Sequence, residues 1–157
     1  MIRIEVEIDI SCPVEEVFEF TVNSDFDSQW QSGVLVAAQT SEGSLAVGAT
    51  FLHEFLFIAR RVSAAFEVTE YSPNEVFGFT STSGPIPIKG SYTYEKLGEN
   101  STRVTVRAES EVGGYSKFAD PLVSRAAQRQ RETNFLTAKD ILESKRSEKR
   151  SWIRTRL

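Results

Sequence analysis

The sequence predicts an α+β domain in which a curved antiparallel sheet of six to seven strands surrounds one long C-terminal helix. Three observations lead to this fold class. Residues 3–10 alternate apolar and charged side chains, and residues 34–112 repeat short strand-like segments between turn signals. Residues 117–144 contain no glycine and are rich in helix-forming residues. The length of 157 residues suits one ordinary domain.

The N-terminal region predicts one strand followed by two short helices. Residues 3–10 read RIEVEIDI, which is typical of a strand with one face on a core and the other in water. Pro13 suits the first position of a helix, since its missing N–H is not needed there. Glu15 favours the same helix start, because the helix dipole attracts negative charge. A second short helix is expected in NSDFDSQW, ending near Trp30.

The middle of the chain predicts six further strands. The segments SPNE, SGPIP and LGENS are turn signals in this region. Because the turns are short, neighbouring strands should pair antiparallel as a meander. The expected strands cover residues 34–40, 48–58, 61–71, 75–82, 88–96 and 102–112.

The C-terminal region predicts one long helix over residues 117–144, the only element able to cover the apolar face of such a sheet. A strongly curved sheet around one helix leaves a space between them, which is a natural ligand cavity. Residues 145–157 hold six basic residues and one acidic residue, and we expect a frayed, solvated extension. The predicted organisation is therefore one domain over residues 1–144 and a basic tail over 145–157.

Charge and composition limit the function. Residues 1–144 hold 12 basic and 21 acidic residues, so nucleic acid is not favoured as a partner. One cysteine excludes an internal disulfide, and one cysteine with one histidine excludes the usual zinc sites, so we expect no metal and no cofactor. The sequence contains no run of about 18 apolar residues, which is the length that a membrane-spanning helix needs. We therefore expect a soluble cytoplasmic protein, with a homodimer left open.

Strand parity predicts which side chains line the cavity, because successive side chains point to opposite faces. On residues 49–57 the charged Glu54 marks the outer face, so His53, the only histidine, points inward. By the same argument, aromatic side chains of the other strands also point inward. We further expect one aromatic residue of the second short helix near the cavity mouth and two amide side chains from the long helix. The predicted ligand-binding residues are Trp30, Phe51, His53, Phe55, Phe66, Phe77, Phe79, Tyr92, Tyr94, Gln130 and Asn134.

Three roles for His53 stay open: a buried neutral ring with a satisfied hydrogen bond, a ligand contact, or a general acid or base. The inward face expected for the neighbouring strands contains no carboxylate. Because burial disfavours a charged ring, we expect a neutral His53 at pH 7 that bonds a tyrosine, an amide or water. No catalytic residue is assigned.

Several motifs, in this order, resemble the START-like (SRPBCC) superfamily in its polyketide cyclase/dehydrase branch. They read IDISCPVEEVFEFTVNSDFDSQW, LAVGATF, FEVTEYSPNEVFGF, GSYTYEKLGENSTRVT and LTAKDILES, and together they cover nearly all of residues 3–144. The resemblance implies the helix-grip fold, in which a curved antiparallel sheet grips a C-terminal helix over a hydrophobic cavity. The single histidine excludes the iron-dependent oxygenase members, and no shared set of catalytic residues carries over from the others.

Three functions remain open, because the fold does not select among them. The first is binding of a hydrophobic or aromatic small molecule, lipid or polyketide-like, in the cavity. The second is a polyketide cyclase or dehydrase-type enzyme in which His53 and a tyrosine move protons and the pocket orients the substrate. The third is a protein-interaction module that uses the outer face of the sheet or the basic tail.

Overall fold

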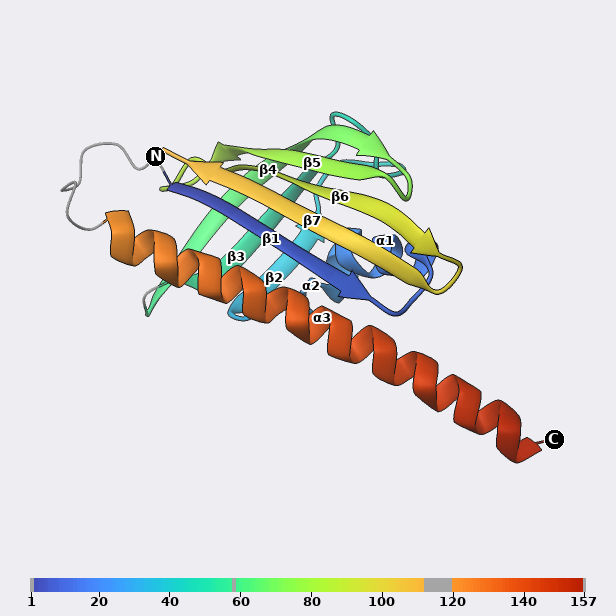
Figure 1. Ribbon diagram of the computed structural model, residues 1–157. Coiled ribbons are helices and arrows are strands. Elements are labelled where there is room, and N and C mark those ends of the chain that lie inside the picture. Colours follow the sequence, from blue (N-terminus) through green and yellow to red (C-terminus); the bar gives the residue numbers. More distant parts are fainter. Residues whose placement is uncertain (1, 58, 112–119, 157) are drawn as a thin grey trace.

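A computed structural model describes residues 2–57, 59–111 and 120–156 of the chain. In this part of the chain, seven antiparallel strands form one curved sheet in the order β1-β7-β6-β5-β4-β3-β2, and a long helix runs beside it (Figure 1). The elements are β1 (Ile2–Ile10), α1 (Val14–Val22), the 3₁₀ turn η1 (Ser24–Phe26), α2 (Asp27–Trp30), β2 (Val34–Gln39), β3 (Thr50–Phe57), β4 (Arg60–Ser72), β5 (Val76–Ser83), β6 (Lys89–Gly98), β7 (Ser101–Ser110) and α3 (Asp120–Arg156).

The predicted fold class is confirmed: the curled antiparallel sheet, the short helices after β1 and the long C-terminal helix make the helix-grip fold. The six strands expected in the middle of the chain are β2 to β7. β1 pairs antiparallel with β7, so the first and last strands lie side by side, with Ile2 opposite Ser110 and Ile10 opposite Thr102. Residues 58, 112 and 117–119 of the expected elements lie outside the described ranges.

The long helix continues further than predicted. α3 ends at Arg156, so the expectation of a frayed extension after residue 144 was wrong, and Figure 1 shows the helix extending beyond the sheet. Extending an existing helix adds a hydrogen bond for each ordered residue, so it needs no apolar face of its own. Contacts also hold the first turn past residue 144: the guanidinium of Arg146 lies 3.6 Å from the carboxylate of Glu16, and the ammonium of Lys145 lies 5.4 Å from the ring centre of Phe20. The domain boundary at residue 144 stays a prediction.

The core lies between the sheet and the three helices. Phe135 of α3 is completely buried, and its ring packs edge-on against Trp30 of α2 and Tyr92 of β6, with ring centres 4.8 Å and 5.4 Å away. Ala138 and Leu142 continue this buried face along α3 at helical spacing. The packing fixes α3 against α2 and β6, and so defines the interior space beneath the sheet.

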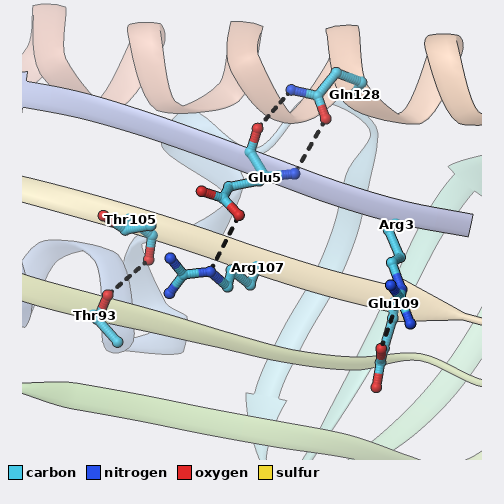
Figure 2. Close-up of polar contacts among 7 residues, drawn as sticks. All are labelled: Arg3, Glu5, Thr93, Thr105, Arg107, Glu109 and Gln128. Atoms are coloured by element: carbon cyan, nitrogen blue, oxygen red, sulfur yellow. Dashed lines mark hydrogen bonds and ion pairs between the residues drawn. The ribbon is translucent and has the colours of Figure 1, made fainter.

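A second face of α3 covers the edge of the sheet. β1 is an edge strand, and edge strands present unpaired backbone groups. Figure 2 shows Gln128 beside Glu5: its amide nitrogen donates to the backbone oxygen of Glu5 at 2.8 Å, and its amide oxygen accepts from the backbone nitrogen at 3.3 Å. Along the same edge, Lys139 donates to the backbone oxygen of Asp9 at 2.6 Å. These bonds set the position of α3 along β1.

The solvent-facing side of the sheet carries cross-strand pairs of opposite charge (Figure 2). The carboxylate of Glu5 accepts a hydrogen bond from Arg107 at 3.2 Å, and the charged groups of Arg3 and Glu109 lie 4.0 Å apart. Such exposed pairs contribute little stability, at most about 1 kcal/mol each. They do confirm that Arg107 and Glu5 lie on the polar face that the alternation in β1 and β7 predicts.

We predict that Phe135→Ala lowers the free energy of unfolding by about 3–5 kcal/mol, because it empties the centre of the packing between α3, α2 and β6. Leu136→Ala is the matched control: Leu136 is the next residue of the same helix and is 52% exposed. It should change the free energy by less than about 0.5 kcal/mol. Urea unfolding followed by circular dichroism measures both variants. Equal losses would contradict this packing.

Candidate functional site

Two adjoining cavities lie in the interior space, with volumes of about 260 Å³ and about 180 Å³. The first lies on the side of α1 and η1, and the second on the side of β1 and the start of α3. Several side chains line both cavities, and therefore form the division between two parts of one interior. These shared residues are Gln31, His53, Phe66, Ile88 and Arg131.

Nine of the eleven predicted site residues line a cavity: strand parity placed seven of them, and the other two are the amides of α3. Whether they bind a ligand stays a prediction. Those that line the first cavity are Phe51, His53, Phe66, Phe77, Phe79 and Tyr92. Those that line the second are His53, Phe55, Phe66, Gln130 and Asn134.

Two predicted residues, Trp30 and Tyr94, line neither cavity. Trp30 was expected near the cavity mouth, but it is 2% exposed and packs against Phe135, because the single turn of α2 directs it into the core. The hydroxyl of Tyr94 lies 2.6 Å from the hydroxyl of Thr21 in α1, and burial raises the pKa of this tyrosine. Both side chains therefore serve the packing of the helices on the sheet.

The main correction concerns His53. Its Nε2 lies 3.0 Å from a carboxylate oxygen of Asp27, the first residue of α2, and the two side chains are 14% and 7% exposed. The expectation that His53 bonds a tyrosine, an amide or water was wrong, because it considered the carboxylates of the neighbouring strands alone, whereas Asp27 belongs to a helix. The segment DSQW did indicate that Asp27 points inward, because Asp27 and Trp30 are three residues apart and share one face of a helix.

Burial raises the pKa of the Asp27 carboxyl above its usual range, against the opposing effects of the hydrogen bond and charge of His53. Two arrangements of the shared proton are chemically open to this pair. An ionised Asp27 accepts a hydrogen bond from Nε2 of His53, whereas a protonated Asp27 donates one to it. The pair can therefore hold a proton at the division between the cavities.

Arg131 is a second site residue that the sequence prediction missed. It belongs to α3 and lines both cavities, and one of its terminal nitrogens lies 3.5 Å from the hydroxyl of Tyr92. Burial raises the pKa of Tyr92. The signal was helical spacing again, since Arg131 lies four residues before the buried Phe135 and so shares its face. The prediction chose the adjacent Gln130 instead.

The two predicted amide side chains of α3 form hydrogen bonds with the backbone just after α2. Asn134 is buried, and its side-chain oxygen accepts a hydrogen bond from the backbone nitrogen of Ser32 at 3.0 Å. Gln130 donates to the backbone oxygen of Ser32 at 3.3 Å. These bonds fix the residues after α2 against α3. They thereby also hold Gln31, the neighbour of Ser32, which lines both cavities.

Metal ligands do not gather in this interior. Within residues 2–57, 59–111 and 120–156, no group of three or more histidine, cysteine, aspartate and glutamate side chains is placed to hold a metal ion. Over the same ranges, no helix combines the length and apolar character needed to cross a membrane.

Comparison with known proteins places the chain in a family. The sequence model of the family described as "Polyketide cyclase / dehydrase and lipid transport" matches residues 1–143. The chain belongs to this family. The predicted resemblance is thereby confirmed, and the family description covers both cyclase or dehydrase enzymes and lipid transport proteins. A search of curated protein sequences found no match.

Solved structures similar to this family member support the fold. The aromatase/cyclase ZhuI from Streptomyces sp. R1128 superposes with a TM-score of 0.76 at 10% identity, covering 90% of this chain and 93% of that one. A START superfamily protein from Mycobacterium smegmatis gives 0.77 at 11% identity, covering 92% and 99%. The protein TTHA0849 from Thermus thermophilus gives 0.77 at 16% identity, covering 90% and 97%. At these identities the likeness shows a shared fold.

We predict that the wild type loses stability relative to Asp27→Asn as the pH rises from about 4. Because the folded state raises the pKa of Asp27, folding favours its protonated form. The stability linked to that proton is present below the usual carboxyl pKa of about 3.9 and is lost as the pH rises through the raised value. Urea unfolding of both proteins across this range measures the difference.

Asp25→Asn, which removes an exposed charge two residues away, controls for the change in net charge. If Asp27→Asn and the wild type keep a constant difference in stability at every pH, the raised pKa of Asp27 is contradicted.

Proposed function

We propose that this protein binds a hydrophobic or aromatic small molecule, such as a lipid or polyketide-like compound, in the interior space beneath the sheet. The observation that carries the proposal is the pair of adjoining cavities divided by His53, Phe66 and Arg131. Ligand sites are typically concave, mostly apolar and supplied with a few polar groups that fix orientation, and this interior has that composition. The family description, which names lipid transport, supports the same class of ligand.

The aromatic walls give the proposal further support. The rings of Phe51 and Phe66 stack with centres 5.2 Å apart, and Phe79 stands edge-on to Phe66 at 5.9 Å. Such ring clusters present both faces and edges to a bound molecule, which suits aromatic or polycyclic ligands. The adjoining volumes of about 260 Å³ and 180 Å³ suit a molecule of several rings that spans the division.

We predict that Ile88→Trp abolishes binding of two-ring and larger hydrophobic compounds while the fold is kept. Ile88 lines both cavities just before β6, so a larger side chain fills the division. Leu97→Trp is the matched control, since Leu97 lies in β6 and is 42% exposed. Thermal shift and native mass spectrometry with a panel of fatty acids, sterols and polycyclic aromatics measure binding.

The expected result is stabilisation of the wild type and of Leu97→Trp by at least one class of the panel, and no stabilisation of Ile88→Trp. A panel that neither stabilises the wild type nor adds mass to it would reject the proposal. Equal binding by Ile88→Trp and the wild type would place the ligand outside the cavities.

A second candidate function is favoured by one observation, the hydrogen bond between Asp27 and His53. A carboxylate that bonds one nitrogen of a histidine orients the ring and supports its use as a general base. In a dehydration, His53 would take the proton from the carbon next to a carbonyl, a carbon–carbon double bond would form, and the hydroxyl would leave as water after accepting a proton from Tyr92 or solvent. Asp27, His53 and Tyr92 all line the first cavity.

This enzyme function predicts that β-hydroxyketone thioesters lose water in the presence of the protein, which mass spectrometry detects. His53→Gln should abolish the reaction, and Tyr94→Phe is the control, because Tyr94 lines neither cavity. Turnover that survives both His53→Gln and Tyr92→Phe would reject this mechanism. Binding without turnover across the panel would leave the first function alone.

A further inference from the structure

We propose that the ligand carries a carboxylate, seated at the division between the two cavities against Arg131 and His53, with its hydrophobic part in the apolar space on either side. The inference rests on the proposed binding function and specifies the chemical class of its ligand. The class is a hydrophobic acid, aromatic or aliphatic, with one negative charge.

Arg131 places a cation at the division between the two cavities. A guanidinium has five N–H donors in a fixed fork that matches a carboxylate. Arg131 is half-buried, and in the described part of the chain no carboxylate lies within 4.0 Å of it; the long contact of 3.5 Å with the Tyr92 hydroxyl is its one hydrogen bond there. Its charge acts on Asp27 only from a greater distance, where it lowers the pKa of that carboxyl. Arg103 on the outer face is the contrast, since two of its nitrogens bond Asp9 at 2.8 Å and 3.2 Å. Removing a cation from water without a directly bonded anion is costly, so Arg131 suits an incoming carboxylate.

His53 and the local balance of charge favour the same class of ligand. Nε2 of His53 bonds Asp27, while its other ring nitrogen has no hydrogen-bond partner among the described residues, although the side chain lines both cavities. When His53 is protonated, this nitrogen is a donor. With Asp27 ionised, the charges of Asp27, His53 and Arg131 then add up to one positive charge. A single carboxylate would bring that sum to zero, which is the balance that buried charges require.

Other carboxylates at the two cavities do not oppose this arrangement. Glu19 lines the first cavity and Glu109 the second, and both residues are exposed to solvent. Glu19 accepts a hydrogen bond from the side-chain amide of Asn23 at 3.0 Å, and the carboxylate of Glu109 lies 4.0 Å from the guanidinium of Arg3. Their charges are therefore screened by water and by their partners, whereas Arg131 lies at the interior division.

The test uses a matched pair of probes, 2-naphthoic acid and 2-naphthamide, which share one ring system and differ in charge. Each competes with the neutral dye N-phenyl-1-naphthylamine, whose fluorescence rises in an apolar cavity. The proteins are the wild type, Arg131→Met, which keeps an unbranched apolar stem, and Arg129→Met. Arg129 is an exposed residue of the same helix, so its variant is the control for the loss of one positive charge.

We expect the wild type and Arg129→Met to bind 2-naphthoate at least about tenfold more tightly than 2-naphthamide, since hydrogen bonds between two charged groups are stronger than those between neutral groups. Arg131→Met should lose this preference, measured as the ratio of the two probe affinities within the variant. Arg129→Met should keep the preference and bind the neutral dye with less than about a threefold change in affinity, a limit well below tenfold. Circular dichroism checks the fold, and Arg131→Gln replaces Arg131→Met if the latter does not fold.

Two results would overturn the inference without touching the proposed function: equal binding of acid and amide by the wild type, or a preference for the acid that survives in both Arg131 variants. Failure of the dye and of both probes to bind the wild type would reject the proposed binding of two-ring hydrophobic molecules, and the inference with it.

Discussion

The packing of Phe135 between Trp30 and Tyr92 is the contact on which the rest of the structure depends. It holds α3 across the space beneath the sheet, and helical geometry then decides what else faces that space. Arg131, one turn earlier, reaches the division between the cavities, and Asn134 fixes the chain after α2. The same ring that closes the core therefore also positions the polar part of the site.

Most of the fold could be predicted, because it follows from local periodicity. The alternation in residues 3–10 and 102–110 defines two strands that each have one apolar face. On these faces Val6, Ile10, Val104 and Val106 are buried as expected, while Ile4 and Ile8 are partly buried and pack against the core. The end of α3 could not be predicted in the same way. The sequence from residue 145 onward lacks an apolar face, but it also lacks the glycine or proline that would end a helix already formed.

The site was predictable in its apolar part and not in its charged part. Parity places Phe51, Phe55 and Phe66 inward because each strand obeys a period of two. Asp27 and Arg131 come from helices, where burial depends on how each helix is rotated against the sheet. That rotation is fixed only by long-range packing, although the spacing of Asp27 from Trp30 and of Arg131 from Phe135 contained the signal. The chemistry of the interior thus depends on contacts between distant parts of the chain.

The bonds between Gln128 and Glu5 have a consequence for how molecules of this protein meet. A strand from another molecule can lengthen a sheet only where the edge strand offers a free N–H and C=O. Both groups of Glu5 are already bonded to one amide side chain, and the oxygen of Asp9 is bonded to Lys139. The α3 helix therefore protects this edge from the strand-to-strand association that begins aggregation and fibril growth, in addition to covering the interior.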